Sequence, residues 1–200
     1  MKEHRNGHKQ QPSPLLSLVG TPDAWILKFS PLMPAGQVLD LACGRGRHGR
    51  YFLKKNYPVT FLDRDISGVA DLNSHPKAKL VQYDLEGDTQ KENILWPFDV
   101  DFFSGIVVSN YLYRPLFPYL LQSLKPGGVL LYQTFAQGNE RFGRPRNPAF
   151  LLEKNELLDV FSTTLDIVDF RQGKESNPDR MTQAICAIKT PDNKSVKVFT

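Results

Sequence analysis

The chain has 200 residues, of which 40% are hydrophobic and 23% are charged; this balance is typical of one globular domain and excludes disordered, collagen-like and disulfide-scaffold proteins. The formal net charge of +4 favours anionic partners mildly and is too small to indicate nucleic-acid binding by itself. Cys43 and Cys186 are the two cysteines, and no apolar leader is visible, so we expect a cytoplasmic protein without disulfides. No apolar run approaches the roughly 18 residues of a membrane span, so we expect no membrane segment.

Residues 1–20 are polar and lack periodicity, so we expect a flexible tail followed by a single domain over residues 21–200. The first predicted helix follows this tail, with Thr21 as its N-cap and Pro22 at its first position. Prolines further along should end that helix, because proline disrupts a helix interior.

Strands and helices alternate through the rest of the chain. Apolar runs typical of strands occupy residues 37–41, 58–62, 79–83, 105–109 and 129–134, with helical stretches after the first run and between the last two. A further predicted helix, near residues 154–161, precedes two strands, 164–170 and 181–189, whose polar connection is too short for a helix. The pattern predicts an α/β fold: a doubly wound, mostly parallel, seven-stranded sheet with an antiparallel C-terminal hairpin.

A glycine-rich turn joins the first predicted strand to the helix that follows it. Residues 44–49 match the pattern G-x-G-x-x-G, and Asp63 lies nineteen positions after the first glycine. This combination is typical of a dinucleotide-binding fold, in which a pyrophosphate sits at the helix N-terminus. Asp40, at the end of the preceding strand, argues against that ligand, because a carboxylate repels a pyrophosphate and suits an ammonium group. Arg45 and Arg47 favour the opposite conclusion, so the turn by itself leaves both ligands open.

Two segments resemble a known family. Residues 38–46, VLDLACGRG, resemble the first motif of class I S-adenosylmethionine-dependent methyltransferases, and residues 124–130, LKPGGVL, resemble the turn that enters the fifth strand of that Rossmann-like fold. The resemblance covers about residues 20 to 190, including the terminal hairpin, and is greatest to small bacterial methyltransferases of the tellurite-resistance type. It implies a methyltransferase enzyme that uses S-adenosylmethionine and releases S-adenosylhomocysteine.

The resemblance also implies roles for individual residues. Asp40 and the glycine turn would hold the methionine part of the cofactor, Asp63 would accept both ribose hydroxyls, and Asp84 would take the adenine amino group. Ile66 would pack on the adenine ring. The full implied cofactor set is Asp40, Ala42, Cys43, Gly44, Arg45, Gly46, Asp63, Arg64, Ile66, Asp84, Leu85, Ser109 and Asn110. Two members depart from the family pattern, which often has glycine in place of Ala42 and a small residue in place of Arg45.

Two segments are predicted to bind the methyl acceptor. The first follows the fourth predicted strand, where the family lines its acceptor pocket, and its candidates for catalysis and substrate binding are Tyr111, Tyr113 and Arg114. The alternative for these side chains is simple packing. The second segment is the long aperiodic loop over residues 135–150, which is typical of a lid or binding loop; its candidate substrate-binding residues are Arg144 and Arg146.

Other chemistries have little support in the sequence. The four histidines show no metal-ligand spacing with the cysteines, so we expect no metal. We predict methyl transfer to a small-molecule acceptor by in-line displacement, which needs a general base only if the acceptor must lose a proton. The alternatives are a nucleic-acid or protein methyltransferase, a nicotinamide-dependent oxidoreductase and a non-catalytic cofactor-binding module. We expect no nucleic-acid or membrane partner, and a monomer or homodimer.

Overall fold

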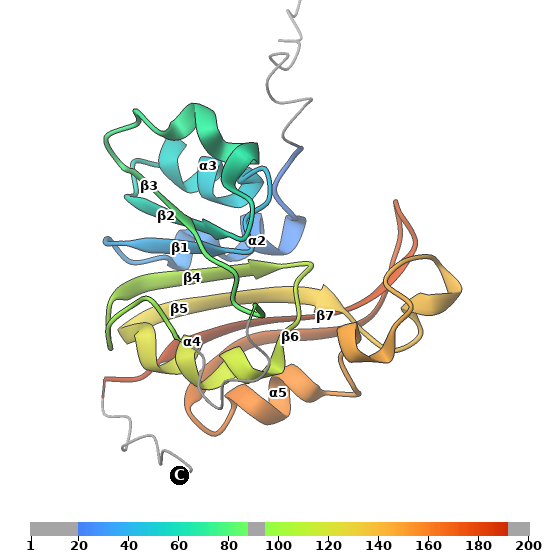
Figure 1. The fold of residues 1–200 in the computed structure, drawn as a ribbon. Helices are drawn as coiled ribbons and strands as arrows, with labels where there is room; N and C mark the ends of the chain where they lie inside the picture. The colour runs from blue at the N-terminus through green and yellow to red at the C-terminus, as the bar shows by residue number, and fades with distance from the viewer. Residues whose placement is uncertain (1–19, 88–94, 192–200) are drawn as a thin grey trace, which may run out of the picture.

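The computed structural model describes residues 20–87 and 95–191, and its strands form one seven-stranded sheet with the order β3-β2-β1-β4-β5-β7-β6 (Figure 1). The strands are β1 (Val38–Leu41), β2 (Val59–Asp63), β3 (Ala78–Gln82), β4 (Phe103–Ser109), β5 (Leu124–Phe135), β6 (Leu165–Glu175) and β7 (Arg180–Lys189). Neighbouring strands are parallel except that β7 runs antiparallel to both β5 and β6. The predicted α/β fold with its antiparallel C-terminal hairpin is confirmed.

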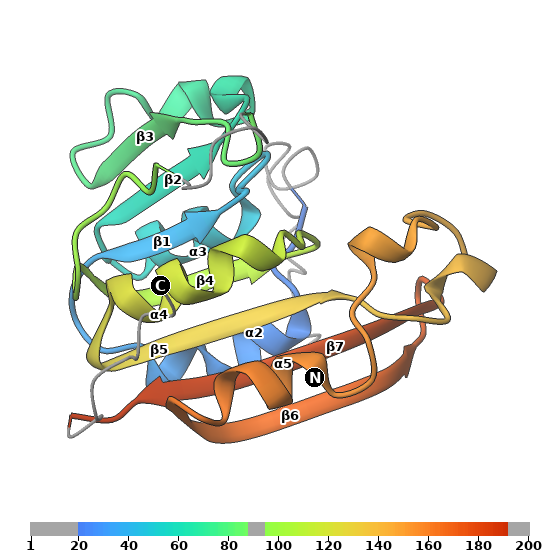
Figure 2. The same cartoon turned by 60° about the horizontal axis from the view of Figure 1, so that its bottom comes forward.

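Helices cover both faces of the sheet (Figure 2). One face carries α2 (Ala24–Phe29), the 3-10 turn η1 (Ser30–Leu32), α3 (Arg47–Lys54) and the 3-10 helix η2 (Ile66–Leu72), and the other carries η3 (Arg114–Leu116), α4 (Phe117–Ser123) and α5 (Glu156–Phe161). Two short 3-10 turns, η4 (Asn139–Arg141) and η5 (Pro148–Phe150), lie in the connection between β5 and α5. Over residues 20–87 and 95–191, no helix is long and apolar enough to cross a membrane.

The central strands are apolar along most of their length because both of their faces are buried. In β4, Ile106 and Val108 belong to the core cluster that contains α4 and α5, whereas Val107 belongs to the cluster that contains α2 and α3. β5 alternates in the same way, with Leu130 on one face and Leu131 on the other. This double core holds the carboxyl ends of the parallel strands at one edge, where ligands bind in open α/β sheets.

The start of the first helix differs from the prediction. The helix begins at Ala24, so its N-cap residue is Asp23 and not Thr21. The Asp23 side chain makes no capping hydrogen bond, because its carboxylate is engaged by residues of α3 and β4, as described below. A long-range contact has therefore replaced the local cap that the Thr-Pro-Asp sequence predicts.

The C-terminal hairpin is longer than predicted. β6 continues to Glu175 and β7 begins at Arg180, so most of the polar connection expected between them is paired strand. The extended arm carries polar residues such as Gln172 and Lys174 and projects past the end of β5 (Figure 1). Hydrophobic alternation could not show this pairing, because the ladder continues where little apolar surface is buried.

Candidate functional site

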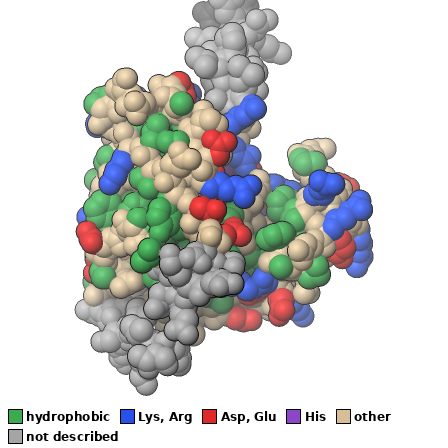
Figure 3. All heavy atoms as spheres, in the orientation of Figure 1, with side chains coloured by type: hydrophobic (Ala, Val, Ile, Leu, Met, Phe, Trp, Pro, Cys, Tyr) green, Lys and Arg blue, Asp and Glu red, His purple; other side chains and the backbone are tan. Residues whose placement is uncertain are grey.

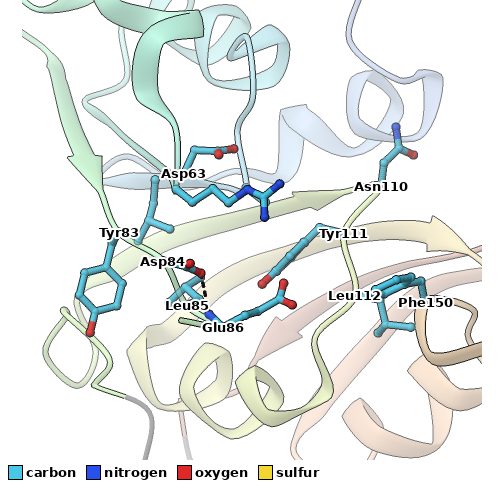
Figure 4. A pocket seen from close by; sticks show the side chains of 12 residues that line it. Asp63, Tyr83, Asp84, Leu85, Glu86, Asn110, Tyr111, Leu112 and Phe150 are labelled. Atoms are coloured by element: carbon cyan, nitrogen blue, oxygen red, sulfur yellow. Dashed lines mark hydrogen bonds between the residues drawn. The ribbon is translucent and has the colours of Figure 1, made fainter. Parts of the chain in front are cut away.

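A cavity of about 340 Å³ opens at the carboxyl ends of β1, β2, β3 and β4 (Figure 4). Side chains from four strand ends and from η5 therefore meet in one place, although their segments are far apart in the sequence. The cavity is lined by Ala42, Leu62, Asp63, Arg64, Tyr83, Asp84, Leu85, Glu86, Asn110, Tyr111, Leu112 and Phe150. The set joins three carboxylates and one guanidinium with apolar and aromatic walls.

The glycine turn has the backbone geometry that its sequence predicts. Gly44 and Gly46 have φ angles of 53° and 70°, which glycine adopts without strain. A Cβ on Gly46 would lie 2.7 Å from Val69, and one on Gly49 would lie 2.2 Å from Phe61. By contrast, a Cβ on Gly44 would meet no atom within 4 Å. The second and third glycines thus let α3 pack closely on the sheet, while the first faces open space.

Ala42, which departs from the family pattern, also adopts a left-handed conformation with φ of 52°. This position demands the backbone that glycine adopts most easily, which explains why glycine is common there in the family that the sequence resembles. Ala42 lines the cavity, whereas the next residue, Cys43, is buried and lies outside the cavity lining. Burial raises the pKa of the Cys43 thiol, so this side chain is protonated and unreactive near neutral pH.

Asp40 lies beneath the turn and outside the cavity lining. Its side chain is 2% exposed, and its Oδ2 accepts a hydrogen bond of 2.7 Å from the Gly49 amide. Burial raises the pKa of Asp40 to about 6. In this structure the carboxylate therefore holds the first turn of α3 and faces no open space that a ligand could enter. Arg45 is exposed on the same turn, and its carbonyl accepts a hydrogen bond from Arg50.

Two carboxylates at strand ends form one wall of the cavity. Asp63, at the end of β2, accepts hydrogen bonds from the Gly44 amide at 2.8 Å and from the Asp65 amide at 3.1 Å. Asp84 follows β3 and accepts from the Glu86 amide at 3.0 Å (Figure 4). Each carboxylate oxygen can accept more than one hydrogen bond, so both groups keep capacity for a ligand.

Other predicted cofactor residues divide between the cavity and the core. Arg64 and Leu85 line the cavity beside the two carboxylates. Ile66 is partly buried and packs against the core cluster of α2 and α3, outside the cavity lining. The predicted stacking of Ile66 on an adenine ring therefore stays a prediction.

Tyr111 and Glu86 also line the cavity, next to Asp63 and Asp84. The Tyr111 hydroxyl points toward the Glu86 carboxylate (Figure 4). Burial, together with a hydrogen bond from this hydroxyl to Glu86, raises the pKa of Tyr111. Tyr132 fixes the same segment, because its hydroxyl donates to the Tyr111 carbonyl at 2.9 Å. Sequence reasoning found Tyr111 but missed Glu86, which stands two positions after Asp84 and carries no motif of its own.

Ser109, the last residue of β4, is hydrogen-bonded to Asp23, an acid at the start of α2 whose side chain is 9% exposed. The Asp23 carboxylate accepts hydrogen bonds from Ser109 at 2.6 Å and from Arg47 at 2.8 Å. Burial acts to raise the pKa of Asp23, but hydrogen bonds from His48 and Ser109 and the charge of Arg47 outweigh it and hold that pKa well below its usual range. Asn110 lines the cavity with a left-handed backbone, φ 56°.

Arg180 extends this network to the C-terminal hairpin. Its guanidinium lies 3.7 Å from Asp23, pairs with Glu175 at 2.6 Å, and donates to the Asn110 side chain at 3.5 Å. Asp23 and Arg180 were not found by sequence reasoning. Apart from the Arg180–Glu175 pair within the hairpin, the partners of both side chains lie at least 24 positions away in the sequence. No local sequence pattern therefore marks them.

Arg114 positions one wall of the cavity. Its guanidinium forms a two-pronged ion pair with Glu156, at 2.6 and 2.8 Å, and donates to the carbonyls of Ala149 and Leu151 at 2.9 and 3.0 Å. These bonds hold the segment that places Phe150 against the cavity. Arg114 itself does not line the cavity, so the geometry supports a positioning role in place of direct substrate contact.

The remaining predicted substrate residues lie elsewhere. Tyr113 packs against the core cluster of α4 and α5, outside the cavity lining. Arg144 and Arg146 are exposed on the connection between β5 and α5. Across the described residues, no three His, Cys, Asp or Glu side chains are grouped so that they could hold a metal ion.

Comparison with known proteins gives one sequence relative and many structural ones. No protein-family model matches the chain. The chain is 31% identical over 141 residues to the malonyl-[acyl-carrier protein] O-methyltransferase of Calditerrivibrio nitroreducens. The match covers 69% of this chain and 55% of that protein, so the chain spans little more than half the length of its relative.

Solved structures show the fold. TehB from Haemophilus influenzae superposes with a TM-score of 0.62 at 20% identity, over 82% of this chain and 61% of that one. The 1,6-didemethyltoxoflavin-N1-methyltransferase of Burkholderia thailandensis, solved with S-adenosylhomocysteine bound, gives 0.61 at 20% identity, over 84% and 76%. The fold is that of the class I S-adenosylmethionine-dependent methyltransferases. The resemblance predicted from residues 38–46 and 124–130, including the likeness to a tellurite-resistance-type protein, is confirmed at this level.

Proposed function

We propose that the protein is an S-adenosylmethionine-dependent methyltransferase that acts on a small molecule. The observation that carries the proposal is that Asp63 and Asp84 meet in one cavity beside the glycine turn. The antiparallel β7 supports this function against a nicotinamide-dependent oxidoreductase, whose dinucleotide-binding sheet has the strand order 3-2-1-4-5-6. The sequence relative is itself named as a methyltransferase.

The residues of the cavity fit such a cofactor. The space above Gly44 is open, so a ligand can approach the backbone of the turn there. Asp63 would accept the ribose hydroxyls, and Asp84 with the Leu85 backbone would face the adenine amino group. Asp40 would act one layer away, because it holds α3 through Gly49 and lies beneath the turn.

The protein's contribution to the reaction would be mainly alignment. When bound, the sulfonium supplies an electrophilic methyl group, so little covalent chemistry remains for the chain. Alignment of an acceptor atom with that methyl can lower the barrier by roughly 7–11 kcal/mol. The apolar side chains of Leu62, Leu112 and Phe150 would exclude water from the cavity. Tyr111 would stay neutral with its one hydroxyl proton directed to Glu86, and its oxygen would accept a hydrogen bond from a protonated acceptor, with the Glu86 carboxylate able to receive a proton.

The test is calorimetric titration with S-adenosylhomocysteine, with NAD titrated in parallel. We expect the nucleoside to bind and the dinucleotide not to bind. Asp63→Asn should weaken binding by about tenfold or more, since a charged hydrogen-bond acceptor is lost. Asp65→Asn is the matched control, because Asp65 is two residues away, exposed and outside the cavity lining; it should bind as the unmodified protein does.

Two results would overturn the proposal. Binding of NAD without binding of S-adenosylhomocysteine would support the oxidoreductase, and equal effects of the two substitutions would remove Asp63 from the site. If the cofactor binds, incubation with S-adenosylmethionine and small acceptors, followed by detection of S-adenosylhomocysteine, tests the substrate class.

A cytoplasmic location is also proposed, because Cys43 and Cys186 are both free and buried.

A further inference from the structure

The connection between β5 and α5 and the tip of the C-terminal hairpin together form a projecting lobe, residues 137–150 and 174–181. The lobe stands away from the sheet, and a notch separates it from the body of the molecule in the space-filling view (Figures 1 and 3). It meets the proposed active site at its base, because Phe150 belongs to the lobe and also lines the cavity.

The lobe is held in shape by polar contacts between its segments. Asn139 is 1% exposed; its Nδ2 donates to the Pro145 carbonyl at 3.2 Å, and its Oδ1 accepts from the Met181 amide at 3.2 Å. Glu140 accepts from the Gly138 amide at 2.9 Å. Arg114 fixes the other end through the carbonyls of Ala149 and Leu151. The outer surface of the lobe is therefore preformed, which lowers the entropy lost when a partner binds.

Three arginines on this surface have no partner among the described residues. Arg141, Arg144 and Arg146 are exposed, and their side chains make no ion pair or hydrogen bond with any part of the chain that the structure describes. By contrast, Arg171, which is also exposed, and Arg50, which is partly buried, each pair with a carboxylate. Figure 3 shows basic side chains gathered on the lobe. Uncompensated positive charge is thus concentrated at one projecting place.

An exposed aromatic ring accompanies the arginines. Phe142 is 40% exposed, and the Lys174 ammonium lies 5.2 Å above its ring. Arginine and aromatic side chains are enriched at the centres of protein–protein interfaces. The basic surface is also short: acidic residues, Glu140 and Asp179, stand within it, and a nucleic acid usually needs a longer continuous basic track to neutralise many phosphates.

We propose that the lobe is a docking surface for an acidic protein partner. The arginines would pair with carboxylates of the partner, and Phe142 would supply an apolar contact at the centre. A protein docked there lies beside the cavity that Phe150 lines, so it can cover a small acceptor bound in that cavity. This last role rests on the proposed methyltransferase function, whereas docking itself does not.

The test uses a fluorescent poly-L-glutamate peptide as the probe, with binding followed by anisotropy at low and at physiological salt. Arg141→Gln, Arg144→Gln and Arg146→Gln are combined in one variant. The matched control combines Lys54→Gln, Lys79→Gln and Lys125→Gln, which remove the same charge from exposed positions away from the lobe. We expect the arginine variant to bind about tenfold more weakly and the lysine variant to change less than about twofold, because charge pairing acts at short range in salt.

A second measurement separates docking from the proposed function and from folding. Both variants should unfold at the same temperature as the original protein and bind S-adenosylhomocysteine equally well, since none of the substituted residues lines the cavity. If the original protein does not bind S-adenosylhomocysteine, the proposed methyltransferase function is refuted, and docking is judged by peptide binding alone.

Three outcomes would overturn the docking proposal. The first is no binding of the peptide by the original protein, and the second is an equal loss in both variants, which would mean attraction by net charge only. The third is tighter, lobe-dependent binding of a labelled single-stranded oligonucleotide of equal charge, which would identify the lobe as a nucleic-acid surface instead.

Discussion

The two halves of the sheet build the site in different ways. Beside β1 and β2, the site is made largely of closely packed backbone, with left-handed residues at the turn and helix α3 close to the sheet. Short carboxylate side chains at the strand ends complete it. Beside β5, β6 and β7, it is made of long side chains that reach between elements, such as Arg114 to Glu156 and Arg180 to Glu175.

This difference predicts how each half responds to substitution. Closely packed backbone cannot accept even one added carbon, because the neighbouring atoms have no room to move. A long side chain that links two elements can be removed at lower cost, because water can reach the groups it leaves behind. Substitutions in the first half should therefore have the larger effects on stability.

The largest effect is expected for Gly46→Ala. The new Cβ would lie 2.7 Å from Val69 and 2.8 Å from Phe61, at a φ of 70°, so we expect a loss of about 3 kcal/mol in the free energy of unfolding. Gly127→Ala, at the start of β5, is the control, since φ is 77° but no atom lies within 4 Å; about 1 kcal/mol is expected. Urea denaturation measures both, and equal losses would contradict the comparison.

The next effect is a pH dependence that originates at Asp40. Because burial raises its native pKa from 3.8 to about 6, the unfolded chain ionises first as the pH rises. The free energy of unfolding should then fall between about pH 4 and pH 6 and level off above. Asp40→Asn keeps an acceptor for Gly49 and removes this fall. The difference in free energy of unfolding between the variant and the original protein should therefore shift in the variant's favour by on the order of 2 kcal/mol between pH 4 and pH 7.

Asp23 should affect the pH dependence of the free energy of unfolding in the opposite direction, which Asp23→Asn tests. Its native pKa is lowered, so this carboxylate stabilises the fold above its ordinary pKa, and the stability is lost as the pH falls through the native value. The variant should therefore be less stable than the original protein at neutral pH, with a deficit that shrinks in acid. Denaturation curves for both variants at several pH values test this, and parallel pH profiles would refute the assigned shifts.

A smaller effect is expected when Arg114 is replaced by alanine. The guanidinium is 37% exposed, so we expect a loss of about 1.5 kcal/mol, at the low end for a charged hydrogen-bonding group. The segment around Phe150 should also become mobile, which faster hydrogen exchange over residues 149–152 would show. Arg141→Ala is the control and should change stability by less than about 0.5 kcal/mol.

The smallest effect is expected at the Lys28–Asp169 ion pair, which joins α2 to β6. The atoms are 2.7 Å apart, but the side chains are 60% and 37% exposed. Lys28→Gln should therefore cost at most about 0.5 kcal/mol, and the difference should vanish in high salt. A loss as large as that of Arg114→Ala would mean that surface pairs hold the second half of the sheet more strongly than we infer.

The first half of the molecule was largely predictable from the sequence. Strand, glycine turn and helix follow one another locally, and the positions of Asp63 and Asp84 at strand ends follow from the parallel topology. Ala42 was recognised as unusual, and its left-handed backbone explains why. The sequence singled out Asp40 but could not show whether its side chain points up into a cavity or down toward a helix, so its role toward the methionine part of the cofactor stays a prediction.

The second half was predicted less well, for a physical reason. Phe150 and Arg180 reach the site through a loop and a hairpin arm that bury little apolar surface, so hydrophobic periodicity gives no signal for them. The same reason applies in the first half to Glu86, which stands in the loop after β3. Asp23 makes its contacts with residues of α3 and β4, and these contacts overrode the local capping preference of Thr21. Such long-range polar pairs become visible only when the fold has brought their segments together.

The two buried thiols have a practical consequence. Burial raises the pKa of Cys186 to about 12 and raises that of Cys43 as well, so neither forms the thiolate that reacts with maleimides. A single cysteine introduced in place of Phe142 would then be the one reactive site in an otherwise unaltered chain. A fluorophore or spin label attached there reports directly on the lobe, without the removal of either native cysteine.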